Sequence, residues 1–345
     1  SSNGCDSRPV TIGDTVNEIE AMTLALDLAT TPGVPLGPNP RVGCVLLREG
    51  RLLAQGYHRG AGHPHAEVDA LAHCADPRGA TAVVTLEPCN HHGRTGPCSL
   101  ALIDAGVTRV VYALADPNPA AAGGAETLRA AGVDVAGPLL EDQARAVNRA
   151  WLSGLTQARP LVTWKFAASL DGRSAASDGT SQWITGPEAR ADVHRLRGEC
   201  DVILAGTGTV ATDDPLLTVR DGRPHQPLRA VMGLRTLDPE HRVFNHDAET
   251  VLLRTREPGE ALAELYATGR RHVWLEGGPT VAAAFLRAGL VDEVIAYVAP
   301  VVLGAGPAAV ADIGVDTINQ ALRLTLLDVT RVGGDVRLTL TPVPS

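Results

Sequence analysis

The segments His65-Ala66-Glu67, Pro88-Cys89 and Cys98 decide how the first half of this 345-residue chain is interpreted. One imidazole and two thiolates can bind Zn²⁺ and leave the fourth tetrahedral position open for water. Glu67 follows His65 by two residues, close enough to share the site without being a ligand. A carboxylate in that place can carry protons in a hydrolytic reaction. The pattern therefore predicts an open, catalytic zinc site.

The spacing of the two cysteines is unusual for this pattern. An H-x-E segment followed by P-C-x-x-C is typical of zinc-dependent deaminases. Here eight residues, rather than two, separate Cys89 from Cys98. Three other histidines are rival ligands, namely His63, His91 and His92. His65 is preferred because of its two-residue spacing to Glu67; a closed site with His91 as fourth ligand is the alternative, and it would leave Glu67 without a role.

The composition indicates an acidic globular chain. The net charge is −9, and only 3% of the residues are aromatic. A nucleic-acid partner favours a basic face with aromatic residues for stacking, so the composition argues against one. No apolar run reaches the roughly 18–20 residues of a membrane span, and no secretory signal is visible. We therefore expect a cytoplasmic protein that acts on small molecules and has no membrane partner.

Strand-like and helix-like segments alternate along the chain, which indicates an α/β architecture in two parts. Residues 1–16 are expected to be a flexible N-terminus. A first domain is predicted over 17–158 and a second over 159–345, because Arg159-Pro160 interrupts a helical pattern just before a new strand begins. The length of the chain also favours two domains.

Three segments carry specific structural expectations. A single helix is predicted over 141–155. Thr185-Gly186-Pro187-Glu188 has the pattern of a capping box that opens a helix. The segments 322–327 and 335–341, on either side of Gly333-Gly334, are expected to pair as antiparallel strands and to close a mixed sheet.

Lysine is used once in this chain. Lys165 is the only lysine among 30 basic side chains, and all the others are arginines. A single lysine in such a sequence indicates a place where a guanidinium cannot replace a compact ammonium. Survival by chance is the alternative.

Two glycine-containing loops follow apolar strands in the second part. Gly206-Thr207-Gly208-Thr209-Val210-Ala211 has the G-x-G-x-x-A pattern, but Asp213-Asp214-Pro215 would end a helix within a few residues. A Rossmann site is therefore not expected there. Glu276-Gly277-Gly278-Pro279-Thr280 ends a strand and opens a helix, where backbone N–H groups can bind phosphate. A simple helix cap is the alternative for this second loop.

Four segments of the first half form a recognisable set: Pro38-Asn39-Pro40-Arg41-Val42-Gly43, His63-Pro64-His65-Ala66-Glu67, 86–95 and Asp116-Pro117-Asn118-Pro119. Together with the eight-residue spacing, they resemble the deaminase domain of the bifunctional riboflavin-biosynthesis deaminase/reductase family. The resemblance implies a cytidine-deaminase-like three-layer αβα fold, Zn²⁺ bound by His65, Cys89 and Cys98, and proton transfer by Glu67. It also implies a substrate pocket lined by Asn39, His91, Arg94, Asp116 and Asn118.

Four segments of the second half, 165–173, 181–185, 213–220 and 276–280, resemble the reductase domain of the same family. The resemblance implies a dihydrofolate-reductase-like α/β fold, NADPH as cofactor and a place for Lys165 as a catalytic residue. It implies cofactor contacts from Ala167, Trp183, Thr209, Asp213, Gly278, Pro279, Thr280, Val281, Ala282, Ala283 and Ala284. It implies substrate contacts from Ser181, Arg197, Leu216, Arg220 and Glu276. The two arginines suit the substrate phosphate, since guanidinium binds phosphate bidentately.

The resemblance implies two consecutive reactions on phosphorylated pyrimidines. The first is the hydrolytic deamination of 2,5-diamino-6-(5-phosphoribosylamino)pyrimidin-4(3H)-one. The second is the NADPH-dependent reduction of the ribosyl chain of 5-amino-6-(5-phosphoribosylamino)uracil to a ribityl chain. A homo-oligomer, dimer or tetramer, is expected as the working form.

One segment departs from the family pattern. Where the family has an Asp-Ser or similar pair near the cofactor, this chain has Gly233-Leu234-Arg235. The departure motivates an alternative, a deaminase whose reductase domain is impaired. It also suggests that Arg235 contacts the 2′-phosphate of the cofactor. An alternative from another class is a nucleotide-binding protein with structural zinc.

Overall fold

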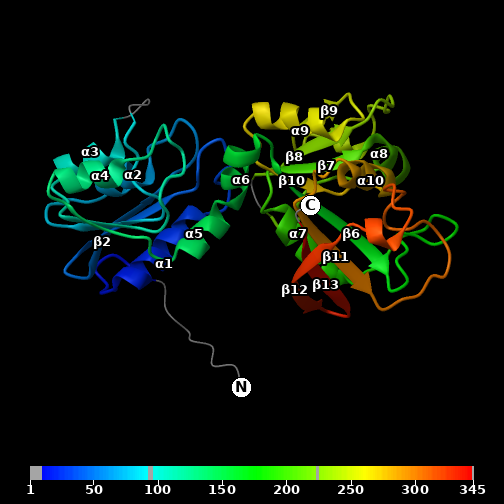
Figure 1. Ribbon diagram of the computed structural model, residues 1–345, viewed down its shortest axis with the longest axis horizontal. Helices are drawn as coiled ribbons and strands as arrows, with labels where there is room; N and C mark the ends of the chain where they lie inside the picture. Colours follow the sequence, from blue (N-terminus) through cyan, green and yellow to red (C-terminus); the bar gives the residue numbers. More distant parts are fainter. Residues whose placement is uncertain (1–9, 92–95, 223–224, 344–345) are drawn as a thin grey trace, which may run out of the picture. The chain divides into compact units, whose positions relative to one another are not determined.

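The chain folds as two compact units, Ser1–Leu155 and Thr156–Ser345, each with its own sheet and hydrophobic core (Figure 1). The computed structural model describes residues 10–91, 96–222 and 225–343. Within these ranges, none of the helices is long and apolar enough to cross a membrane. Both units mix helices and strands, which confirms the expected α/β architecture.

A five-stranded mixed sheet forms the centre of the first unit, with the order β2-β1-β3-β4-β5. β1 pairs antiparallel with β2 and β3, whereas β3, β4 and β5 are parallel. The strands are β1 (Gly43–Arg48), β2 (Arg51–Tyr57), β3 (Thr81–Val84), β4 (Arg109–Tyr112) and β5 (Asp134–Ala136). Parallel strands in the middle of a sheet are buried on both faces, which explains why β3 is apolar throughout its inner positions.

Helices cover both faces of this sheet. α1 and α5 contact each other, and α2, α3 and α4 form a second group on the opposite face (Figure 1). The helices are α1 (Glu18–Ala29), α2 (Ala66–Ala72), α3 (Cys98–Asp104), α4 (Gly124–Ala130) and α5 (Glu141–Val147). The three-layer arrangement expected for the first domain is confirmed.

Two glycines let helices approach the sheet closely. A Cβ atom at Gly43 would lie 1.9 Å from the Ala25 carbonyl oxygen of α1. A Cβ atom at Gly56 would lie 2.3 Å from the backbone nitrogen of Ala70 in α2. Neither clash could be relieved by a side-chain movement, because both contacts are with backbone. Gly56 therefore sets the position of α2, the helix that begins directly after His65.

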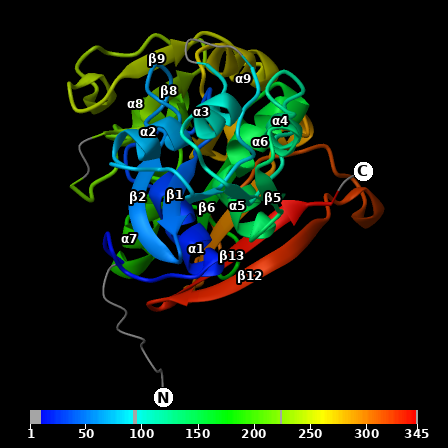
Figure 2. The ribbon, with the colours of Figure 1, turned by 90° about the vertical axis from the view of Figure 1, so that its left-hand side faces the viewer.

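The second unit contains an eight-stranded sheet with the order β12-β13-β11-β6-β10-β7-β8-β9. The six strands from β11 to β9 are parallel to one another. The long β12–β13 hairpin, orange-red to red in Figure 2, extends this sheet, and its strand β13 pairs antiparallel with β11. The strands are β6 (Leu161–Ser169), β7 (Val202–Gly206), β8 (Leu228–Met232), β9 (Thr250–Leu253), β10 (His272–Leu275), β11 (Glu293–Ala299), β12 (Leu324–Val332) and β13 (Asp335–Pro342). The expected terminal antiparallel pair is confirmed.

Two hydrophobic cores lie on the two faces of this sheet. α9 (Pro258–Ala267) and α10 (Pro279–Arg287) supply Leu262 and Phe285 to one core. α7 (Pro187–Arg197) and α8 (Thr207–Asp213) supply Val193 and Val210 to the other. The remaining helical segments are α6 (Arg149–Gln157), η1 (Arg242–Phe244) and η2 (Ile318–Gln320).

The single helix expected over 141–155 is wrong. Two helices, α5 and α6, occupy this region, and Asn148 lies between them. The Asn148 side chain accepts a hydrogen bond from Arg41 N (2.8 Å) and donates one to Arg41 O (2.9 Å). An asparagine whose amide pairs with distant backbone in this way competes with helix continuation.

The capping box expected at Thr185 is also wrong. Gly186 is the N-cap of α7, and no side chain caps this helix end. The Gly186 N–H instead donates to the Asp335 carboxylate, 2.7 Å away. Pro187 in the first turn is as expected, because the proline needs no partner for its nitrogen.

Candidate active sites

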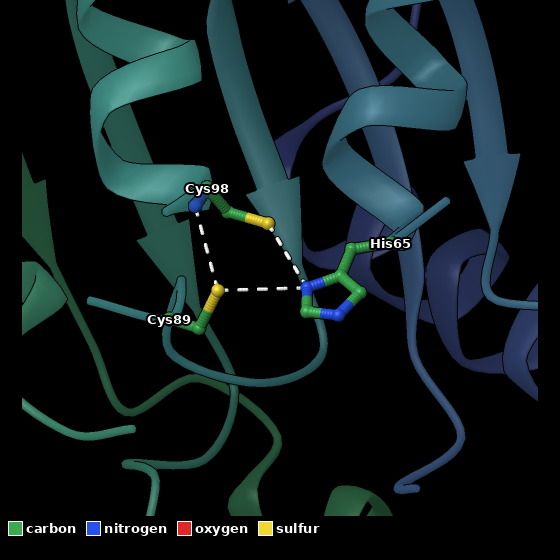
Figure 3. Close-up of side chains that lie close together, drawn as sticks. All are labelled: His65, Cys89 and Cys98. Carbon is green, nitrogen blue, oxygen red and sulfur yellow. Dashed lines mark hydrogen bonds between the residues drawn. The ribbon is translucent and has the colours of Figure 1, made fainter. Parts of the chain in front are cut away.

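His65, Cys89 and Cys98 come together in the first unit (Figure 3). His65 is the N-cap of α2, Cys98 is the first residue of α3, and Cys89 lies in the loop after β3. The His65 Nδ1 atom is 3.2 Å from Cys98 Sγ and 3.5 Å from Cys89 Sγ. A tetrahedral Zn²⁺, with Zn–S near 2.3 Å and Zn–N near 2.0 Å, places its sulfur and nitrogen ligands roughly 3.5 Å apart. The three side chains therefore fit a zinc ion and leave one ligand position open.

The site favours thiolate character at Cys89. A hydrogen bond from the Cys98 thiol, opposed by burial and supported by His65, lowers the pKa of Cys89 to about 4. The same hydrogen bond to Cys89, together with burial, raises the pKa of Cys98. The Cys98 backbone N–H also points at Cys89 Sγ from 3.4 Å. Backbone N–H groups at a helix start stabilise an anionic sulfur, which a cationic metal requires.

Glu67 is almost fully buried beside this group of side chains, with 4% of its surface exposed. Burial raises the pKa of Glu67 to about 7. A carboxyl group with that pKa can both take and give a proton near neutral pH.

Asn39, a predicted pocket residue, is held by a histidine that the sequence did not single out. His58 Nδ1 lies 2.9 Å from the Pro64 carbonyl oxygen, which can only accept, so Nδ1 carries the proton. His58 Nε2 is then an acceptor, and it lies 3.0 Å from Asn39 Nδ2. The contact fixes the orientation of the Asn39 amide, with its nitrogen toward His58. His58 is buried, and burial lowers its pKa, so the ring is neutral.

The other predicted pocket residues lie around the same loops. The His91 ring is 6.5 Å from the His65 ring. Asp116 accepts a hydrogen bond from Asn118 N (2.9 Å), and burial raises the pKa of Asp116. Arg94, together with His92, lies outside the described residues. Glu87, which the sequence did not single out, accepts from Asp116 N and thereby fixes this loop.

In the second unit, two predicted cofactor-binding loops lie against each other. α8 follows β7, and α10 follows β10, the strand next to it. Gly278 N donates to Thr209 Oγ1 (3.3 Å) across the two loops. A Cβ atom at Gly206 would lie 2.7 Å from Val281 Cγ2. The predicted residues Thr209, Gly278 and Val281 are therefore brought together at the carboxyl ends of parallel strands, where α/β sheets bind ligands.

Arg197 and Glu276, two predicted substrate contacts, form an ion pair in which 14% and 11% of the side-chain surfaces are exposed. Arg197 Nε lies 2.7 Å from Glu276 Oε1, and a second guanidinium nitrogen bonds Oε2. Burial raises the pKa of Glu276, but Arg197 and Lys165 together lower it to about 2. Lys165 is half-buried in β6; burial lowers its pKa and Glu276 opposes that effect. Lys165, Arg197 and Glu276 thus form one charged cluster, although the sequence separated them widely.

The remaining predicted cofactor and substrate contacts of the second unit differ in exposure and in the side chains next to them. Trp183 is 65% exposed, and the Arg190 guanidinium stacks over its ring at 4.3 Å. Ser181 and Asp213 are exposed, and Ala167 is half-buried in β6. The Leu216 carbonyl accepts from the fully buried Arg229 at 3.4 Å. Arg220 contacts His194, a residue that the sequence did not indicate.

The departure at Gly233 has a steric explanation. Gly233 has φ +139°, and a Cβ atom there would lie 2.4 Å from Thr207 Oγ1. The Thr207 side chain, which is buried, therefore fills the space next to Gly233. The Asp-Ser type of pair could not be accommodated while Thr207 keeps this position. Arg235 is exposed, and its carbonyl accepts from Arg254 (3.1 Å).

The fold and the two sites define a zinc-binding deaminase domain followed by a reductase domain. Residues 16–114 match the cytidine and deoxycytidylate deaminase zinc-binding region, and residues 160–338 match the RibD C-terminal domain. The second match alone spans more than half of the chain.

The chain belongs to the RibD family of riboflavin biosynthesis proteins. It is 50% identical over 328 residues to riboflavin biosynthesis protein RibD of Mycobacterium tuberculosis, covering 93% of this chain and 96% of that one. It is 40% identical over 358 residues to RibD of Escherichia coli K12, covering 92% and 98%.

Solved structures agree with this assignment. The diaminohydroxyphosphoribosylaminopyrimidine deaminase/5-amino-6-(5-phosphoribosylamino)uracil reductase of Thermotoga maritima superposes with a TM-score of 0.86 at 30% identity, covering 94% of this chain and 99% of that one. RibD of Acinetobacter baumannii superposes with a TM-score of 0.85 at 37% identity, covering 95% and 99%. The family resemblance noted from the sequence is confirmed.

Proposed function

We propose that the chain carries out two consecutive steps of riboflavin biosynthesis. The first unit deaminates 2,5-diamino-6-(5-phosphoribosylamino)pyrimidin-4(3H)-one, and the second reduces the ribosyl chain of the resulting 5-amino-6-(5-phosphoribosylamino)uracil with NADPH. The observation that carries this proposal is the placement of His65, Cys89 and Cys98 around one point, with buried Glu67 beside them. A metal-ligand triad with a free position and a neutral-range carboxyl group is what hydrolytic deamination requires.

The first unit's residues have distinct roles in this proposal. His65, Cys89 and Cys98 would hold a zinc ion, which would supply Lewis-acid chemistry for the activation of water. Glu67, with its pKa near 7, takes a proton from the water and gives a proton to the departing amino group, which leaves as ammonia. The reaction consumes one water and replaces the amino group by a carbonyl oxygen, so no further reactant is needed.

Asn39 and Asp116 suit recognition of a pyrimidine. Asn39 Oδ1 is available as an acceptor because His58 holds the amide nitrogen. It can therefore accept a hydrogen bond from an N–H of the substrate base. Asp116, half-buried and hydrogen-bonded to Asn118 N, adds a second acceptor group. Orientation by such groups aligns the reacting carbon with the activated water.

The second unit's loops suit a nicotinamide cofactor. The start of α10 offers backbone N–H groups next to Thr209, a setting that favours a pyrophosphate. A bound NADPH would supply a hydride for C1′ of the opened ribosyl chain. Lys165 would orient the ribose beside Glu276, and solvent water would supply the proton that completes the amine product. Arg197 and Arg220 would both contact the substrate. Because Arg197 is paired with Glu276, the guanidinium of Arg220 is the one that would bind the substrate phosphate.

We also propose a homo-oligomer. The β12–β13 hairpin exposes an apolar surface that a monomer rarely leaves in water. Leu326, Leu327 and Val329 of β12 are 53%, 59% and 56% exposed, and β12 is an edge strand. A second copy of the chain would cover this surface. The described cysteines are free thiols, which supports a reducing, cytoplasmic location.

A stepwise experiment tests the proposed function. Zinc content, ammonia release and NADPH oxidation are measured in that order on the purified protein, with Glu67→Ala as the control. We expect one zinc per chain, ammonia from the diaminopyrimidine substrate, and NADPH oxidation with the deaminated product. Retained ammonia release in Glu67→Ala would contradict the mechanism. Deamination without NADPH oxidation would indicate an impaired reductase, and a chain that releases no ammonia but unfolds on chelation would indicate structural zinc.

A further inference from the structure

His194 makes two contacts with a single arginine. It lies in α7, three residues before Arg197, and it is half-buried. Its Nε2 atom is 3.2 Å from Arg220 Nε and 3.0 Å from a terminal guanidinium nitrogen of Arg220. Its Nδ1 atom is 3.3 Å from the backbone nitrogen of Arg220. The imidazole therefore contacts both the side chain and the main chain of Arg220.

The two contacts decide the tautomer. A neutral imidazole has one acceptor nitrogen and one N–H. The guanidinium of Arg220 has only donors, and it is the stronger and closer partner, so Nε2 is the acceptor and Nδ1 carries the proton. Burial lowers the pKa of His194 to about 4, and the positive charges of Arg197 and Arg220 contribute to this decrease. The carboxylates of Glu276 and Asp221 act in the opposite direction. The ring is therefore neutral near pH 7 and can accept from the guanidinium.

The Arg220 backbone N–H also points at the ring, 3.3 Å from Nδ1. A neutral ring accepts at only one of its nitrogens, so the contact at Nε2 is the hydrogen bond that holds the guanidinium.

Arg197 and Arg220 differ in whether a carboxylate is paired with them. Arg197 is neutralised by Glu276 and also donates to the Thr218 carbonyl (3.1 Å). Arg220 is exposed, and among the described residues no carboxylate lies within ion-pair distance of it. Arg220 is therefore the guanidinium of this pair that is available for a ligand, and an exposed arginine needs a partner to hold one geometry.

We propose that His194 is a positioning residue of the second site: it holds Arg220 in the geometry that binds the 5′-phosphate of the reductase substrate. This inference rests on the proposed reductase function. His194 Nε2 accepts from the guanidinium and holds its orientation, which leaves the other guanidinium N–H groups for the phosphate oxygens. Preorganisation of this kind lowers the entropy lost when the substrate binds.

The test is steady-state kinetics of NADPH oxidation with 5-amino-6-(5-phosphoribosylamino)uracil and with the same compound lacking its phosphate. Loss of a charge-assisted hydrogen bond is worth about 1.5 kcal/mol, so His194→Ala should raise KM for the phosphorylated substrate about tenfold. kcat should change less than about twofold, because His194 does not contact the reacting atoms. KM for the dephosphorylated compound should be unchanged.

Two matched variants separate positioning from folding. His194→Gln keeps an acceptor and a donor and should restore most of the KM, whereas His194→Phe keeps the ring volume and should behave as His194→Ala. In an Arg220→Ala background, His194→Ala should add no further increase. An unchanged KM in His194→Ala, equal effects on both substrates, or full additivity with Arg220→Ala would each overturn the inference. Absence of NADPH oxidation in the wild-type chain would instead contradict the proposed reductase function.

Discussion

Arg197 and Glu276 face each other as a largely buried ion pair, with Arg197 Nε 2.7 Å from Glu276 Oε1. The Trp274 indole N–H also donates to this carboxylate, at 2.5 Å. The pair links the end of α7 to the end of β10, so it joins two layers of the second unit. A buried charge that loses its partner is costly, which makes this pair a sensitive point of the fold.

Glu276→Gln should lower the free energy of unfolding by about 3 kcal/mol at pH 7, because Arg197 would remain buried without a counter-charge. Glu276 has a pKa of about 2 when folded, below the value of about 4.3 for an unfolded glutamate. Its stabilising contribution is therefore complete above about pH 5 and is lost as the pH falls towards 2. The measurement is urea unfolding from pH 7 to pH 2.5.

The control for this variant is Glu264→Gln, which changes an exposed glutamate of α9. It should leave the free energy of unfolding nearly unchanged at every pH. A difference between wild type and Glu276→Gln that stays constant down to pH 2.5 would show that the carboxylate charge is not the cause.

Glu67→Gln should abolish most deamination while the protein still binds zinc. The amide cannot transfer protons, and loss of a general acid–base group costs roughly 10²–10⁴-fold in rate. The measurements are ammonia release and zinc content. Glu126→Gln, at an exposed position of α4, is the matched control and should behave as wild type. A tenfold or smaller loss in Glu67→Gln would assign the proton transfer to another group.

Removal of zinc should separate the two activities. A chelator, or Cys98→Ser, should stop ammonia release because the ligand triad is lost. NADPH oxidation with the deaminated substrate should continue, because none of the three ligands belongs to the second unit. Zinc added after chelation should restore deamination in the wild type but not in Cys98→Ser. Parallel loss of both activities would contradict this independence.

Lys165→Arg should lose reduction and keep deamination. The guanidinium is larger and planar, so in this half-buried place beside Glu276 it would not put its charge and donors where the compact ammonium has them. The assay compares NADPH oxidation with ammonia release in the same preparation, so deamination reports that the protein is folded. Wild-type reduction in Lys165→Arg would remove Lys165 from the mechanism.

Gly233→Ala should lower the free energy of unfolding by about 1–3 kcal/mol. The backbone has φ +139°, which side chains rarely adopt, and the new Cβ would meet Thr207 Oγ1 at 2.4 Å. Gly208→Ala is the control, since a Cβ there has nothing within 4 Å and lies in a helix. That variant should be neutral or slightly more stable. Equal denaturation midpoints for the two variants would contradict the steric explanation.

The sequence predicted what depends on local pattern. Periodicity predicted the α/β alternation in two parts and the terminal antiparallel pair, and motif spacing predicted the His65–Cys89–Cys98 group. The three-layer fold of the first unit was implied by the family resemblance. The two wrong elements have distant causes: Asn148 bonds Arg41, 107 residues away, and Gly186 bonds Asp335, 149 residues away. Side-chain contacts over such separations leave no local signal.

The same limit explains the site residues that the sequence did not indicate. His58 acts on Asn39 from 19 residues away, and His194 acts on Arg220 from 26 residues away. Nothing in the sequence marks either residue: His58 directly follows the strand β2, and His194 lies within the helix α7. Only the folded chain shows that its ring nitrogens meet another polar side chain, so such positioning residues emerge from tertiary structure alone.

The metal-ligand group also joins segments that are far apart in the chain. His65 and Cys98 are 33 residues apart, and they begin two different helices of the same layer. An ion bound there closes the intervening chain into a loop and removes conformational freedom from the unfolded state. Zinc supply would then govern how long the first unit survives proteases as well as how fast it turns over. A zinc-starved cell would lose the deaminase through degradation, while the reductase unit outlasted it.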